Sequence, residues 1–190
     1  MKIILANILS IAFLNSVYSQ IPGFLEAKEF SKEISLFKSK EFLFQSVLGS
    51  SEQVTSFEVI PLAAASSGEL TTLLYACESK KKEGLILGFY GLERNEFGQT
   101  YMGFSFKNIE KEKAIEFLNK IEKSIEENKK YLKENNDFNN IFFKFDDMDI
   151  LIWGLESGFY SIRIFWNGFD STWDKTSFDR SKSRFLKNLK

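Results

Sequence analysis

The sequence predicts an α+β fold, an antiparallel sheet of about seven strands with the helices packed on one face. Short segments of alternating apolar and polar residues, separated by turn residues, predict the strands. A long amphipathic segment follows the first strands, and a second helical segment ends the chain. The predicted order is meander, long helix, meander and C-terminal helix. The high phenylalanine content, 21 residues, also favours a β-rich core.

Residues 1–19 are typical of a signal peptide, and residues 20–190 are expected to form a single α+β domain. Lys2 is the only charged residue before an apolar run at residues 3–14, and Ser19 is a suitable small residue for cleavage. The run is shorter than the roughly 20 residues that cross a bilayer, although an uncleaved anchor remains an alternative. We therefore expect an exported protein, periplasmic or secreted, with no stable membrane span after cleavage.

The stretch that follows the signal peptide mixes phenylalanine and leucine with lysine and glutamate. It does not keep one apolar period long enough to separate helix from strand. The pattern favours a short helix at residues 25–32 and a strand at residues 35–44.

Four strands are expected in the next part of the chain, at residues 54–62, 69–78, 85–93 and 100–106. The links between them are short and rich in turn residues, so neighbouring strands should be antiparallel. Along the second strand, apolar residues occur in both alternating sets, which predicts that neither face of this strand is fully exposed. Cys77 near its end is expected to be a buried small hydrophobe, and a reactive thiol is the alternative.

The long helix is the clearest element in the sequence. Its apolar stripe consists of Ala114, Phe117, Leu118, Ile121, Ile125 and Leu132. Glutamate and lysine residues fill the opposite side, as in a helix that packs on a sheet. Asn108 is a candidate N-cap. Burial of the stripe should dominate the stability of this helix.

Three more strands are expected at residues 141–145, 150–153 and 159–166, with an acidic turn between the first two. In the last of them, the set that should face the core is Tyr160, Ile162, Ile164 and Trp166. A loop at residues 167–174 leads to a terminal helix rich in lysine and arginine. The sequence contains no internal repeat, low-complexity tract or proline-rich linker.

Composition excludes several classes of function. The net charge of −1 provides no field that would gather nucleic acid. The chain has no histidine, which excludes Ser-His-Asp and Cys-His catalysis, and one cysteine cannot form an internal disulfide or an ordinary zinc site. Asp146, Asp147 and Asp149 could in principle bind Ca²⁺, but their spacing fits a hairpin turn better than a calcium loop. We therefore expect no cofactor and no metal.

A candidate binding surface lies in the densest mixture of aromatic and polar residues. It consists of Trp166, Asn167, Phe169, Asp170 and Trp173. Rings beside amide and carboxylate groups offer stacking and hydrogen bonding to a ligand. The alternative is that these rings close the edge of the sheet and pack under the terminal helix.

The prediction for function is a non-catalytic exported protein that binds a protein, a peptide or another ligand, either through the exposed sheet face or through the loop that bears Trp166 and Trp173. Two alternatives stay open. One is a carrier of a small apolar ligand or lipid, which requires a phenylalanine-lined cavity of about 300 Å³ or more. The other is a hydrolase that uses two carboxylates, which requires an acid with a raised pKa.

Overall fold

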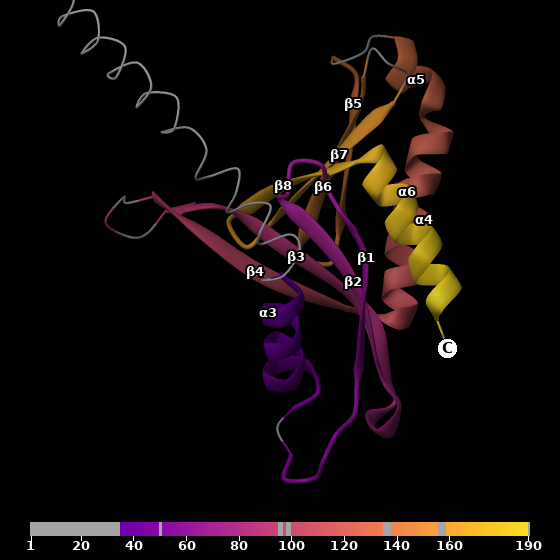
Figure 1. Ribbon diagram of the computed structural model, residues 1–190. Helices are drawn as coiled ribbons and strands as arrows, with labels where there is room; N and C mark the ends of the chain where they lie inside the picture. The colour runs from indigo at the N-terminus through magenta and orange to yellow at the C-terminus, as the bar shows by residue number, and fades with distance from the viewer. Residues whose placement is uncertain are drawn as a thin grey trace, which may run out of the picture.

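The computed structural model describes residues 35–49, 51–94, 97, 100–134, 138–155 and 159–189. The expected signal peptide and the helix expected at residues 25–32 lie outside these residues. Figure 1 shows two antiparallel sheets with helices packed on them, which confirms the α+β class and the two meanders. No helix in the described parts of the chain is long and apolar enough to cross a membrane.

The strands form two sheets of four strands, so the expectation of one sheet was wrong. Sheet A contains β1 (Glu58–Ala64), β2 (Leu70–Cys77), β3 (Lys82–Arg94) and β4 (Thr100–Glu110), in that order. Sheet B contains β5 (Asn140–Phe145), β6 (Met148–Gly154), β7 (Tyr160–Trp166) and β8 (Phe169–Asp174), also in sequence order. Each strand pairs antiparallel with the next within its sheet.

Strand β8 replaces the loop expected at residues 167–174. Asn167 and Gly168 both have positive φ, 50° and 81°, and form a tight turn that returns the chain beside β7. Along β8, buried Ser171 and Trp173 alternate with the more exposed Asp170 and Thr172. Asp170, Ser171 and Thr172 are polar, and such residues are common in loops, so the sequence did not predict a strand here.

The segment expected as a strand at residues 35–44 is helical instead. It forms α3 (Ser35–Phe42) and continues into a π-helix (Leu43–Val47). Leu36, Ser39 and Leu43 follow helical spacing, and the buried Leu43 packs with the side chains of sheet A. Packing of this stripe therefore outweighed the strand preference of the neighbouring phenylalanines.

The long helix is confirmed as α4 (Lys111–Glu127), followed by the short α5 (Lys129–Glu134), and the C-terminal helix is α6 (Lys175–Asn188). The whole predicted apolar stripe of the long helix is buried. The expected cap at Asn108 was wrong. Strand β4 continues to Glu110, which pairs with Gly84, so the helix begins directly at the end of the strand.

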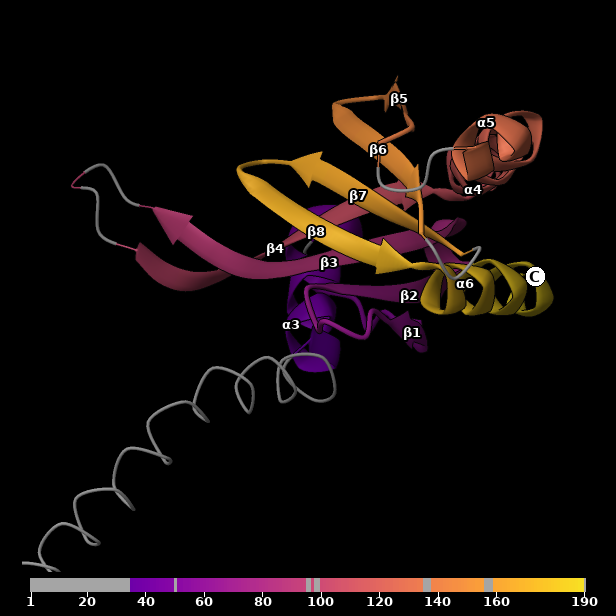
Figure 2. The ribbon, with the colours of Figure 1, turned by 90° about the horizontal axis from the view of Figure 1, so that it is seen from above.

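One core cluster joins the two sheets and the helices α4 and α6. The ring of Phe117 on α4 lies 5.0 Å from the ring of Phe145 on β5 and 6.4 Å from that of Trp173 on β8. The ring of Phe178 on α6 lies edge-on to that of Trp173, with the ring centroids 5.0 Å apart. The two helices stand side by side along one side of the molecule, and β8 crosses close to β3 (Figure 2).

A second core cluster fills the opposite face of sheet A, where α3 packs (Figure 1). Strand β2 contributes Leu70 and Leu74 to the first cluster and Leu73, Tyr75 and Cys77 to the second. This confirms the prediction that neither face of the strand is exposed, and it confirms that Cys77 is buried. Sheet A thus has a core cluster on each face, although Leu92, Tyr101, Met102 and Phe104 at the outer ends of β3 and β4 are exposed. In sheet B the core lies on one face only.

The order of a four-stranded meander followed by a helix occurs twice along the chain. Strands β1 to β4 lead into α4 and α5, and strands β5 to β8 lead into α6. The sequence contains no matching repeat, so this is a repetition of topology in which the two halves use different side chains.

Candidate functional site

The outer face of sheet B is the sheet surface that points away from the core. Its side chains are those of Asn140, Phe142, Lys144, Asp149, Leu151, Trp153, Ser161, Arg163, Phe165, Asp170, Thr172 and Asp174, of which Ser161 is buried. These residues alternate with the core residues along each strand, as the pleat of a sheet requires. The register places them in rows across the sheet, and one row runs from Phe142 through Leu151 to Arg163.

Four apolar side chains give this face an aromatic character. Phe142 is 82% exposed and Phe165 is 38% exposed, while Leu151 and Trp153 are half-buried. All four lie outside the two core clusters. Grouped exposed apolar side chains with polar residues around them are typical of interaction surfaces.

Two cross-strand ion pairs flank the apolar side chains. Lys144 Nζ lies 3.6 Å from Asp149 Oδ1, and Arg163 Nη2 lies 2.7 Å from Asp170 Oδ2. The Arg163 Nε atom is buried and makes no hydrogen bond within the described structure. A buried donor without a partner costs free energy.

The structure separates the residues of the predicted binding surface between the two faces of sheet B. Trp173 is 1% exposed and Phe169 is 3% exposed, so both rings belong to the core. Asp170 lies on the outer face, where it pairs with Arg163. Asn167 lies in the β7–β8 turn and donates to Ser105 Oγ at 3.4 Å. Because Phe169 and Trp173 are buried, a ligand can reach Asn167 and Asp170 but not these two rings.

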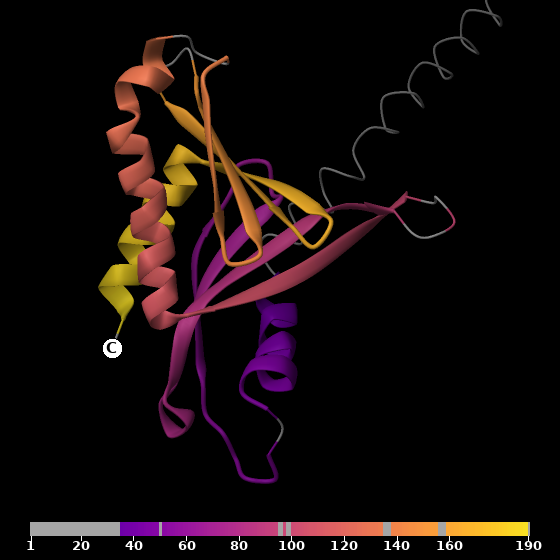
Figure 3. The same cartoon turned by 180° about the vertical axis from the view of Figure 1, so that it is seen from behind.

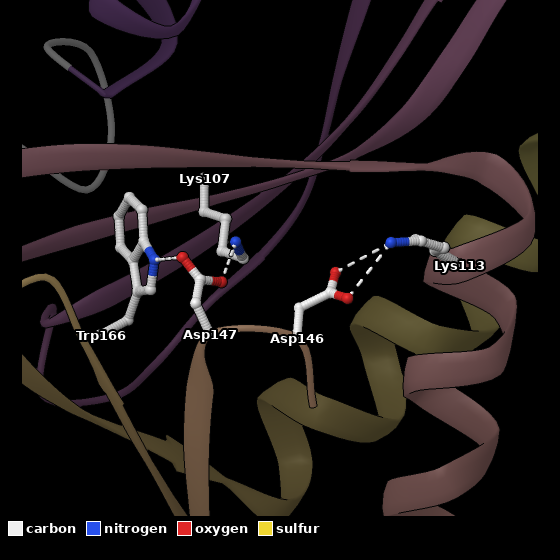
Figure 4. A network of polar contacts seen from close by, with 5 residues as sticks. All are labelled: Lys107, Lys113, Asp146, Asp147 and Trp166. Atoms are coloured by element: carbon white, nitrogen blue, oxygen red, sulfur yellow. Dashed lines mark hydrogen bonds and ion pairs between the residues drawn. The ribbon is translucent and has the colours of Figure 1, made fainter. Parts of the chain in front are cut away.

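Trp166, the remaining member, takes part in a polar network with Asp147 and Lys107 (Figure 4). The indole Nε1–H donates to Asp147 Oδ2 at 2.8 Å, and Lys107 Nζ donates to Asp147 Oδ1 at 2.5 Å. The same ammonium group lies 5.2 Å from the centroid of the Trp166 ring. Hydrogen bonds from Lys107 and then Trp166 hold the pKa of Asp147 below its ordinary value.

The acidic β5–β6 turn connects sheet B to its neighbours through these carboxylates. Figure 4 shows Asp146 facing Lys113 on α4 while Asp147 faces Lys107 on β4, and the Asp146 to Lys113 distance is 3.2 Å. Asp149 pairs with Lys144 within sheet B. Each carboxylate of the turn therefore has a lysine partner. The described residues contain no group of three or more acidic or cysteine side chains arranged to hold a metal ion.

Asp174 has a different role, as the cap of α6. It accepts hydrogen bonds from the Ser177 N–H at 3.0 Å and from the Ser66 N–H at 2.9 Å. Burial alone would raise its pKa, but the hydrogen bonds from Ser66 and Ser177 lower the pKa below its ordinary value. Asp147 and Asp174 are thus both shifted in the direction opposite to that of a catalytic general acid.

A cleft of about 760 Å³ lies at one end of sheet A, beside the β2–β3 turn and the start of α4. Its described lining consists mainly of lysine and glutamate side chains, with one phenylalanine, Phe57. Tyr75 also lines it, and burial raises the pKa of Tyr75 to about 12, against a hydrogen bond from Asn108 that lowers it. Lys80 Nζ donates to the carbonyl of Leu48, the residue that follows the π-helix, at 2.7 Å. This lining differs from the phenylalanine-lined cavity expected of an apolar-ligand carrier.

The exposed Phe142 and Phe165 and the half-buried Trp153 were not among the residues expected to bind. Their signal in the sequence is the alternation of the strands: each lies one position away from a residue of the core set. Once Ile164 and Trp166 are assigned to the core, Phe165 must point to the other face. The exposed sheet face was expected as one of two possible binding surfaces, but the sequence did not show which of its residues α4 and α6 leave uncovered.

Comparisons with protein-family models, with curated proteins and with solved structures find no match for this chain. The residues of the chain itself are therefore the basis for assigning a function.

Proposed function

We propose that this protein is a non-catalytic exported protein that binds a protein or peptide partner through the outer face of sheet B. The observation that carries the proposal is the asymmetry of this sheet. Its inner face packs on sheet A, α4 and α6, while its outer face presents Phe142, Leu151, Trp153 and Phe165 outside both core clusters. Aromatic side chains of this kind supply much of the binding energy of protein interfaces.

The polar groups around the aromatic side chains define the chemistry of the partner. Apolar side chains of the partner would cover Phe142, Leu151, Trp153 and Phe165. A backbone carbonyl or carboxylate of the partner would accept a hydrogen bond from the accessible part of the Arg163 guanidinium group, which already pairs with Asp170 through Nη2. The ion pair between Arg163 and Asp170 lies on β7 and β8 beside Phe165, and it would orient the partner more than strengthen its binding.

The chemistry of the chain supports a role without catalysis. The sequence has no histidine to act as a general base near neutral pH. The charged groups Lys144, Asp149, Arg163 and Asp170 of the outer face are held in cross-strand pairs. Export, which rests on the N-terminal sequence, would place the partner in the cell envelope or outside the cell.

Affinity capture from envelope and culture-medium fractions of the producing cells tests this proposal. The purified protein is compared with Phe165→Ser, which changes the outer face, and with Phe37→Ser, which changes an exposed phenylalanine on α3. A partner should be retained by the original protein and by Phe37→Ser. The affinity of Phe165→Ser for that partner should fall by about tenfold or more, as for a central interface residue.

Thermal unfolding of the three proteins shows whether each is folded before binding is compared. Retention of the same partner by Phe165→Ser with unchanged affinity would move the binding surface elsewhere. If the original protein itself retained no partner from either fraction, the proposal would be wrong.

A further inference from the structure

Sheet B has two edge strands, β5 and β8, and they differ in how they are covered. At β8, the outward-pointing Thr172 N–H donates to Glu69 Oε2 at 3.0 Å, and Ser66 binds Asp174. The β1–β2 turn of sheet A therefore occupies that edge. At β5, β6 is the only described strand that is hydrogen-bonded. Seen from behind, no helix crosses in front of the orange strands of sheet B (Figure 3).

The register shows which backbone groups of β5 point away from β6. Phe145 and Met148 close a two-residue turn, so they form a hydrogen-bonded pair. Alternation along the strand then leaves the N–H and C=O groups of Asn140, Phe142 and Lys144 pointing outward. The carbonyl of Lys144 does point outward, because it accepts a hydrogen bond from Lys120 Nζ on α4 at 3.1 Å.

We propose that β5 pairs antiparallel with β5 of a second copy of this chain, around a two-fold axis at Phe142. In this register the outward N–H and C=O groups of Phe142 lie opposite those of Phe142 in the second copy. The outward N–H and C=O groups of Asn140 lie opposite those of Lys144 in the second copy. Each pair can exchange both of its backbone hydrogen bonds. The edge is thus complementary to itself, as a two-fold interface requires.

The side chains agree with the same register. The two Phe142 rings lie beside each other on the outer face and form an aromatic cross-strand pair. On the inner face, Ile141 lies opposite Phe143, so both positions are apolar. Each Lys144 lies opposite an uncharged Asn140. An axis at Lys144 would instead place two ammonium groups opposite each other, which disfavours that register.

Lys120 limits the strength of this contact. Its ammonium group uses one acceptor site of the Lys144 carbonyl, and a carbonyl oxygen offers two. A lysine at a strand edge weakens strand pairing in general. The pairing is therefore a weak and reversible one, through which two copies join their outer faces into one larger surface.

Substitutions at Asn140 test both the contact and its register. Asn140→Asp places a carboxylate opposite Lys144 of the second copy, and Asn140→Lys places an ammonium group there. Both replace the amide that donates to the Phe138 carbonyl at 2.8 Å, so each is the control for the other. Sedimentation velocity measures the dimer dissociation constant of the purified proteins.

The original protein should form a dimer whose proportion rises with concentration. Asn140→Asp should tighten the dimer about fivefold and Asn140→Lys should weaken it about fivefold, since each change acts at two symmetric pairs. High salt should reduce both effects. A protein that stays monomeric up to about 1 mM, or two variants that shift the dissociation constant in the same direction, would overturn the proposal. Phe165→Ser lies away from the edge and should leave the dimer unchanged, so this result is independent of partner binding.

Discussion

Gly84 shows how closely a single position can be constrained in this fold. It lies on β3 opposite Glu110, between the backbone of β4 and the ring of Tyr75. A Cβ atom at this position would lie 2.9 Å from Tyr75 Cε1 and would also clash with the carbonyl oxygen of Ile109. The buried Tyr75 ring therefore packs against sheet A in the space that the missing side chain leaves.

We expect Gly84→Ala to lower the free energy of unfolding by about 2–3 kcal/mol, because the backbone of β4 cannot yield as a flexible side chain would. Urea denaturation measures this change. Gly91→Ala on the same strand is the control, since its nearest contact would be Phe169 Cδ1 at an ordinary 3.7 Å. Equal effects of the two substitutions would show that the packing around Gly84 is looser than described.

At the scale of elements, Asp174 joins three parts of the fold. It ends β8, caps α6 through Ser177, and binds Ser66 in the β1–β2 turn. The β1–β2 turn also covers the edge of β8, because Glu69 in this turn accepts a hydrogen bond from the Thr172 N–H. One carboxylate thus fixes the start of a helix and helps to hold sheet A against sheet B.

Asp174→Ala should lower the free energy of unfolding at neutral pH by about 1–2 kcal/mol, the range for loss of an N-cap. The pKa of this carboxyl lies below its ordinary value of 3.8 in the folded protein. Its contribution to stability is therefore complete above pH 3.8 and is lost as the pH falls through the folded-state pKa. Urea denaturation at neutral and acidic pH should show the difference from the original protein shrinking in acid.

The matched control for this prediction is Asp149→Ala, which removes a carboxylate from an exposed surface pair with Lys144. Such a pair contributes at most about 1 kcal/mol. A loss of stability at Asp174 no larger than at Asp149, or a difference that persists unchanged in acid, would contradict the capping role.

The elements that could be predicted from the sequence are those whose pattern is local. The stripe that contains Phe117, Ile121 and Ile125 fixed α4, and the alternation in β2 and β7 fixed those strands and their core faces. The helix α3 was missed because its apolar residues gain their burial from sheet A, which the local sequence does not contain. The division into two sheets was missed for a similar reason, since pairing between strands depends on contacts distant in sequence.

At the scale of the whole molecule, the two sheets are not equivalent. Sheet A has a core cluster on each face, and sheet B has one core face and one outer face. The candidate binding residues could be predicted only in part for this reason. The sequence placed Trp166 and Asp170 together in the predicted binding surface. The pleat of β7 and β8 instead directs their side chains to opposite faces of sheet B.

The asymmetry of sheet B is the central claim, and hydroxyl-radical footprinting with mass spectrometry tests it most directly. Phe142 and Phe165 on the outer face should be oxidised rapidly, while Phe117 and Trp173 in the core should be protected, even though tryptophan is intrinsically the more reactive side chain. Oxidation of Trp173 at a rate similar to that of Phe142, or protection of Phe142 and Phe165 at protein concentrations where the chain is monomeric, would contradict the account.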